Sequence, residues 1–189
     1  MFHIKNDARF LKSSEMLYQG LCSCIKRKSF DEITVSDISK ESTVSRATFY
    51  RNFDCITDVL YWKCDQRFSS VLRECVDHTE STEDRMDFLL QIFQRWMENT
   101  EILELLIQIK RIDIIYNCFR ANAHIITDHI KNYHLYDSAE CDYYIYIRIG
   151  IFIGIVQAWL EHGKRESASD IVSILEHQVN DTLAGGTIL

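Results

Sequence analysis

The sequence contains no proline and only six glycines in 189 residues. Folds built from strands and tight turns need both residue types, so their scarcity favours helices joined by short polar connections. Hydrophobic residues make up 47% of the chain and charged residues 26%. This composition supports a buried core and argues against disorder. We therefore predict an all-α protein.

The signatures of metal sites and enzymes are also missing. The cysteines number seven, and no two have the CxxC spacing of a zinc site. We interpret them as reduced thiols that pack as small hydrophobic residues, with a redox sensor as the alternative. His124 and His129 are five residues apart, which does not place them on one helix face for a metal. HExxH, P-loop and GxSxG motifs are absent, so we expect no metal, no cofactor and no enzymatic activity.

The sequence offers no secretory signal and one segment long enough to span a membrane. No apolar signal segment opens the chain, which predicts a cytoplasmic protein. Residues 143–160 are long enough to span a bilayer core as a helix that rises about 1.5 Å per residue. Arg148 near the middle of this segment, together with Gln157, opposes insertion. We therefore expect a buried helix here and no membrane partner.

Charge divides the chain unevenly. Residues 1–53 carry nine Lys and Arg against six Asp and Glu, a net charge of +3, whereas the net charge of the whole chain is -7. The remaining 136 residues therefore have a net charge of -10. A basic first segment on an acidic body suggests two different tasks for the two parts.

Apolar periodicity predicts a series of helices along the chain. The expected helices cover about residues 7–28, 35–42, 46–50, from Ile56 onward, 84–109, 112–133, 138–162 and 167–181. Two short helices behind a longer one predict a three-helix helix-turn-helix domain over residues 1–53. The longer helices predict a second domain, a helical bundle over residues 54–189.

The short segment TVSRATFYRNF offers few aliphatic side chains to a core. Its polar residues suit a helix whose N-terminal end enters the DNA major groove. Arg46 can form two hydrogen bonds with guanine, Ala47 and the Thr48 methyl group can contact thymine, and Tyr50 can donate to a phosphate. The expected DNA-binding residues are Thr34, Ser45, Arg46, Ala47, Thr48, Tyr50, Arg51 and Asn52. A surface helix that binds nothing is the alternative.

The segment ITVSDISKESTVSRATFYRNF resembles the DNA-binding signature of the tetracycline-repressor (TetR) family. The matching positions are Ile33, Thr34, Val35, Asp37, Ile38, Val44, Ser45, Thr48, Tyr50 and Phe53. The later segment GIVQAWLEHGKRESASDIVSIL is also similar to the family. The resemblance implies an all-helical homodimer, an N-terminal domain that binds double-stranded operator DNA, and a C-terminal domain that binds a small effector. It also implies that the last two long helices form the dimer contact.

Five positions depart from the family pattern. Ser42 and Thr43 replace the usual Ala-Gly of the turn, where glycine tolerates left-handed geometry better. Asn52 replaces a common histidine. Cys55 stands where a capping side chain is common, and Ile56 where a phosphate-contacting lysine is common.

Two features of residues 54–189 bear on function. Gly150 and Gly154 allow either close helix approach across a dimer contact or relief of crowding in a helix rich in β-branched residues. Candidate residues for an effector pocket are Trp96, Tyr116, Arg120, His124 and Trp159, although aromatic residues at helical spacing are also typical of an ordinary core. We expect a ligand-responsive repressor that binds a near-palindromic operator as a homodimer. The alternative is a helical adaptor whose N-terminal domain no longer binds DNA.

Overall fold

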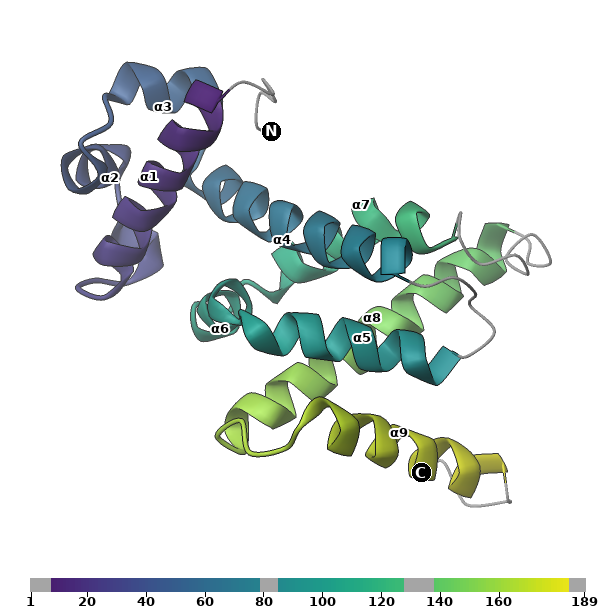
Figure 1. Cartoon of the computed structure of the whole chain (residues 1–189). Coiled ribbons are helices and arrows are strands. Elements are labelled where there is room, and N and C mark those ends of the chain that lie inside the picture. The colour runs from purple at the N-terminus through teal and green to yellow at the C-terminus, as the bar shows by residue number, and fades with distance from the viewer. Residues whose placement is uncertain (1–7, 79–84, 128–137, 184–189) are drawn as a thin grey trace. The chain divides into compact units, whose positions relative to one another are not determined.

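The computed structural model describes residues 8–78, 85–127 and 138–183 (Figure 1). Within these residues the regular structure is entirely helical, and the predicted all-α fold is confirmed. The elements are α1 (Ala8–Ile25), the 3-10 turn η1 (Phe30–Glu32), α2 (Val35–Ser42), α3 (Arg46–Asn52), α4 (Ile56–His78), α5 (Arg85–Glu98), α6 (Glu101–Gln108), α7 (Ile112–Thr127), α8 (Ser138–Glu161) and α9 (Ala168–Leu183).

The apolar segment 84–109 was expected to be one helix, and the structure divides it into α5 and α6. The break falls at Asn99 and Thr100, two residues whose side chains compete with helical backbone hydrogen bonds. The expected helix over 112–133 ends at Thr127 among the described residues, and its last positions lie outside them.

Contacts divide the chain into two units, each of which is described separately. The first unit comprises residues 1–68 and 102–118, and the second comprises residues 69–101 and 119–189. The predicted domain boundary between residues 53 and 54 stays a prediction. We call residues 8–53, which hold α1 to α3, the head.

An aromatic cluster forms the core of the first unit. Phe53 lies 6.0 Å from Phe49, 6.1 Å from Phe10 and 6.2 Å from Trp62, measured between ring centroids. Phe49 and Phe53 are fully buried. Trp62 belongs to the second turn of α4, so the start of this helix packs with α1 and α3.

Gly20 allows α1 to approach α2 closely. A Cβ atom at Gly20 would lie 2.8 Å from Cβ of Ser42 and 3.1 Å from the carbonyl oxygen of Ile38. Real Cβ contacts essentially never reach 2.8 Å, so a larger residue at Gly20 would push the two helices apart. The glycine thus allows α2 to pack directly against α1.

The second unit has its own aromatic core. Phe152 of α8 lies 5.6 Å from Trp96 and 6.2 Å from both Phe93 and Phe119. α9 packs against α5 in the same unit. Phe93, Trp96 and Phe152 are buried because the apolar sides of α5 and α8 pack against each other.

The expectation of a buried helix over residues 143–160 is corrected by the structure. One side of α8 is buried, but Tyr143, Tyr146, Ile147 and Ile151 are exposed in the single chain. Within the described part of the chain, no helix combines the length and apolar character needed to cross a membrane. The exposed side of α8 therefore presents apolar side chains to the surface, uncovered by the residues that the structure describes.

Candidate nucleic-acid interface

The start of α2 is fixed by reciprocal hydrogen bonds between Thr34 and Asp37. The Asp37 N–H donates to Oγ1 of Thr34 at 3.2 Å, and the Thr34 N–H donates to the Asp37 carboxylate at 2.8 Å. Nζ of Lys28 lies 2.6 Å from the same carboxylate. This ammonium first, and then the Thr34 hydroxyl, hold the pKa of Asp37 well below its usual range. Thr34 thus acts as a helix cap in this structure.

The turn between α2 and α3 contains a left-handed residue. Thr43 has φ 59° and ψ 12°, a conformation that glycine adopts readily and a β-branched residue does not. The Val44 N–H donates to Oγ of Ser42 at 3.2 Å, which closes the turn. Ser45 then caps α3 by accepting a hydrogen bond from the Thr48 N–H at 3.2 Å. The position where the family usually has glycine is therefore the one that needs it.

α3 has one buried side and one exposed side. Phe49 is fully buried, and its ring makes an edge contact with Tyr50 at 5.4 Å. Tyr50 is 51% exposed. Arg46, Ala47 and Arg51 are also exposed. The exposed residues share a face that can enter a groove while Phe49 anchors the helix.

Asn52 was expected to contact DNA, and the structure instead places it inside the head. Its side chain is 3% exposed, and Nδ2 donates to Oγ of Ser13 at 2.9 Å and to Oγ of Ser14 at 3.4 Å. A buried amide must find such partners because leaving it unbonded is costly. Asn52 ties α3 to α1, and we leave it out of the proposed DNA-contacting residues.

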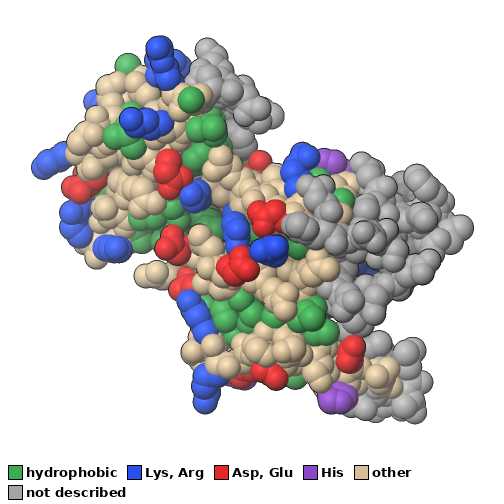
Figure 2. All heavy atoms as spheres, in the orientation of Figure 1, with side chains coloured by type: hydrophobic (Ala, Val, Ile, Leu, Met, Phe, Trp, Pro, Cys, Tyr) green, Lys and Arg blue, Asp and Glu red, His purple; other side chains and the backbone are tan. Residues whose placement is uncertain are grey.

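The charges of the head include cations that are available for phosphates. Arg27 pairs with Glu41 at 2.6 Å, and Lys28 pairs with Asp37. Arg46 and Arg51 are exposed and make no ion pair with any described residue. Figure 2 shows Lys and Arg side chains projecting from the outer side of the head. This distribution suits a surface that approaches a polyanion.

The start of α4 carries two acidic residues, Asp54 and Asp58. The Asp58 carboxylate accepts hydrogen bonds from the Asp54 N–H at 3.1 Å and from the Cys55 N–H at 3.2 Å. It thereby supplies the cap that Cys55 lacks. The Asp54 and Cys55 N–H groups therefore donate to Asp58 in this structure.

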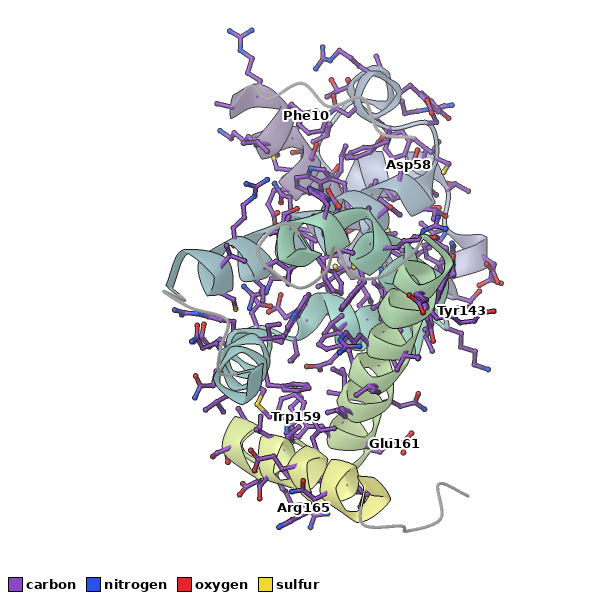
Figure 3. All side chains as sticks on the ribbon, turned by 90° about the vertical axis from the view of Figure 1, so that its right-hand side faces the viewer. Phe10, Asp58, Tyr143, Trp159, Glu161 and Arg165 are labelled. Atoms are coloured by element: carbon purple, nitrogen blue, oxygen red, sulfur yellow. The ribbon has the colours of Figure 1, made fainter. Side chains whose placement is uncertain are left out.

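The candidate effector residues are distributed over both units. Trp96 and Trp159 are buried in the second unit, and Nε1 of Trp159 donates to the Glu166 carbonyl oxygen at 2.9 Å. Figure 3 shows Trp159 between the end of α8 and α9. Arg120 and His124 of this unit are exposed, and Tyr116 belongs to the first unit. These five residues stay a predicted effector set.

The cysteine environments bear on metal binding and redox chemistry. Sγ of Cys118 lies 3.7 Å from the Tyr61 carbonyl oxygen, and a hydrogen bond with Cys64, together with burial, raises the pKa of the Cys118 thiol. Burial raises the pKa of Cys75 to about 11. Protonated, buried thiols are poor nucleophiles, which favours a packing role. Among the described residues, no group of three or more His, Cys, Asp or Glu side chains could hold a metal ion.

Comparison with known proteins identifies the family of the second half of the chain. Residues 83–181 match the family model of a TetR-type domain described as "Transcriptional regulator C-terminal region". The match covers slightly more than half of the chain. No curated protein matches the chain.

Proposed function

The chain belongs to the TetR family of transcriptional regulators, and from that premise we propose that it is a ligand-responsive repressor that binds a near-palindromic operator as a cytoplasmic homodimer. Residues 1–53 would bind DNA, and residues 54–189 would bind the effector and dimerise. The observation that carries the proposal is the exposed face of α3. It presents Arg46, Ala47, Tyr50 and Arg51, while Phe49 holds the helix in the head core.

The exposed side chains of α3 divide into base-contacting and phosphate-contacting roles. Arg46 occupies the first position of the helix, where a guanidinium can form two hydrogen bonds with guanine O6 and N7. Ala47 and the Thr48 methyl group lie next to it and suit a thymine methyl group. Tyr50 and Arg51, one turn later, suit phosphates. Thr34 and Ser45 act indirectly as caps that orient the backbone N–H groups of α2 and α3.

Homodimer formation is proposed from the exposed side of α8. Tyr143 is 72% exposed, Ile147 is 57% exposed, and Tyr143 projects freely from the helix in Figure 3. A Cβ atom added to Gly150 or Gly154 would meet no atom within 4 Å. This open space favours the first reading of the two glycines, namely close approach of a partner helix. Ile174 of α9, which is 53% exposed, adds a further apolar group to the proposed contact.

Ligand response follows from the geometry that a dimeric repressor needs. Two recognition helices must meet half-sites about 34–36 Å apart, so a small displacement of one head lowers the affinity for the operator. An effector that binds the second unit, near Trp96 and Trp159, would act through such a displacement.

The DNA-binding proposal is tested with labelled duplexes from the region upstream of the gene that encodes this protein. Wild-type protein should bind one such duplex more tightly than random DNA, as measured by fluorescence anisotropy. Arg46→Ala should weaken binding to that duplex by about 1–3 kcal/mol and binding to random DNA much less. Equal losses on both DNAs would assign Arg46 to a phosphate contact.

The dimer proposal is tested with Gly150→Leu. The space around Gly150 is open within one chain, so the variant should fold normally but lose the close approach of the partner helix. Sedimentation should show monomers at concentrations where the wild type is dimeric. Gln94→Leu, on the exposed side of α5, is the control for an added surface leucine. A dimer that survives Gly150→Leu unchanged would place the contact elsewhere.

A second function, that of a helical adaptor, is favoured by one observation. The Asp58 carboxylate and Asp54 lie at the start of α4, where they repel a phosphate, and Ile56 supplies no compensating cation. An adaptor of this kind would bind no upstream duplex above the random-DNA level. The anisotropy comparison therefore separates the two functions.

A further inference from the structure

The side chain of Arg111 contacts three different elements of the first unit. Its Nη1 donates to Oγ1 of Thr57, in the first turn of α4, at 3.2 Å. Its guanidinium carbon lies 5.9 Å from the ring centroid of Phe30, in η1. Its Nε and Nη2 donate to the two carboxylate oxygens of Asp113, in the first turn of α7, at 2.8 and 2.7 Å.

The backbone of Arg111 is fixed by the end of α6. The Arg111 N–H donates to the Leu106 carbonyl oxygen at 2.8 Å, and the Lys110 N–H donates to that of Ile107 at 3.1 Å. Lys110 has φ 59°, so these bonds form the left-handed turn that commonly closes a helix. Arg111 therefore leaves α6 in a defined direction.

Asp113 fixes the orientation of the Arg111 side chain. A guanidinium held by two parallel hydrogen bonds to one carboxylate has a defined plane and little rotational freedom. The hydrogen bonds from Arg111 lower the pKa of Asp113, so this pair stays charged at neutral pH. With Nε and Nη2 occupied, Nη1 is directed at Thr57 and the flat side of the group covers Phe30.

The two residues that Arg111 holds have a particular place in the chain. Phe30 precedes α2, and Thr57 follows α3 after a short connection. One side chain thus contacts the chain just before the helix-turn-helix and just after it. Because the same guanidinium contacts Phe30 and Thr57, it restrains both ends of the segment from α2 to α3.

We propose that Arg111 is a positioning residue for operator binding, which holds both ends of the helix-turn-helix segment against the connection between α6 and α7. The inference rests on the proposed DNA-binding function. A dimer bound to two half-sites needs both heads at a defined distance and angle, whereas a head on one half-site does not. Loss of Arg111 should therefore weaken binding to a complete operator more than binding to a single half-site.

The test compares wild type, Arg111→Ala and Arg111→Lys on two labelled duplexes. One duplex carries the complete sequence protected by the wild type in a footprint, and the other carries half of it. We expect Arg111→Ala to weaken binding to the complete duplex by about tenfold and binding to the half-site by at most about twofold. Arg111→Lys should recover part of the loss, because lysine keeps the charge but not the two parallel hydrogen bonds.

Hydrogen exchange provides a readout that needs no DNA. In Arg111→Ala, peptides over residues 29–36 and 54–62 should exchange faster, whereas peptides from the middle of α1 should be unchanged. Arg95→Ala is the matched control, because Arg95 pairs with Glu74 and Glu98 in the second unit and should change neither readout. Equal losses on both duplexes, or unchanged exchange in both segments, would overturn the positioning role. A wild type that binds no duplex would refute the proposed function, and the exchange comparison would still decide whether Arg111 holds the two segments.

Discussion

The side-chain amide of Asn52 in α3 donates a hydrogen bond to Oγ of Ser13 in α1 at 2.9 Å, across 39 positions of sequence. Its neighbour Arg51, in the same helix, is exposed. Two adjacent polar residues thus have different roles, since Asn52 joins α3 to α1 and Arg51 faces outward.

Replacement of these two neighbours should separate stability from DNA binding. Asn52→Ala should lower the free energy of unfolding by about 1–3 kcal/mol, because the half-buried Ser13 hydroxyl and the buried Ser14 hydroxyl lose a partner. Arg51→Ala should change the unfolding free energy by less than about 0.5 kcal/mol and weaken DNA binding instead. Urea unfolding and anisotropy on the same samples check both. Wild-type stability in Asn52→Ala would show that its two hydrogen bonds contribute nothing.

The left-handed turn residue gives a prediction of increased stability. Thr43→Gly should raise the free energy of unfolding by roughly 0.5–1 kcal/mol, because relief of left-handed strain exceeds the added chain entropy of glycine. Ala47→Gly, at a regular helical position, should lower it by about 1 kcal/mol. Urea midpoints of the three proteins test the difference. A Thr43→Gly variant less stable than wild type would mean that the threonine side chain stabilises the turn.

Ile56→Lys should restore a phosphate contact at the start of α4. Each cation that neutralises a phosphate adds about 0.9 to the magnitude of the salt slope, so a dimer should gain about two. The tighter binding should appear on operator and random DNA alike, and most clearly at low salt. Gln94→Lys, which adds the same charge on α5, controls for net charge.

Ile56 is half-buried, so the same variant tests a competing role for that side chain. An unchanged salt slope combined with a lower melting temperature would show that Ile56 packs in the head and that no phosphate lies beside it. Anisotropy titrations at several salt concentrations, with thermal unfolding of the same samples, separate the two outcomes.

The Asp37 carboxylate should make the stability of the head depend on acid pH. Its pKa is lowered in the folded state from an ordinary 3.8, first by Lys28 and then by Thr34. The stabilising contribution is therefore complete above the unfolded pKa and is lost as the pH falls through the lower, folded pKa. Wild type and Asp37→Asn should differ most near neutral pH and converge in strong acid.

Urea unfolding from neutral pH down to about pH 2 measures this convergence. Lys28→Met removes the largest cause of the lowered pKa, so in that background the effect of Asp37→Asn should depend less on pH. A difference between wild type and Asp37→Asn that is constant over the whole range would show that the ion pair does not control the stability.

Local features of the head could be predicted because their partners lie within a few positions. Thr34 and Asp37 are three residues apart, as are Ser45 and Thr48, and short-range capping chemistry identifies both pairs. Phe49 and Phe53 are large apolar residues, a type that is usually found in a core, and both are buried. The break between α5 and α6 was missed because the apolar pattern continues through Asn99 and Thr100.

Contacts between distant segments could not be predicted in this way. Arg111 and Thr57 are 54 positions apart, and no local pattern indicates that the guanidinium reaches the first turn of α4. The direction of the Asn52 side chain depends on where α1 lies relative to α3, which a polar residue in a polar segment does not indicate. The exposed side of α8 was also missed, since an apolar helix has the same sequence pattern whether its chain or a partner covers it.

The sequence by itself determined the all-α class, the caps and turn of the head, and the resemblance of that head to a DNA-binding signature, because propensities, capping and short-range spacing act within a few residues. Only the tertiary structure decided which polar residues of α3 face outward, which carboxylate caps α4, and which arginine holds both ends of the helix-turn-helix. These outcomes depend on distances between side chains from separate helices, which packing sets and the order of residues alone does not reveal.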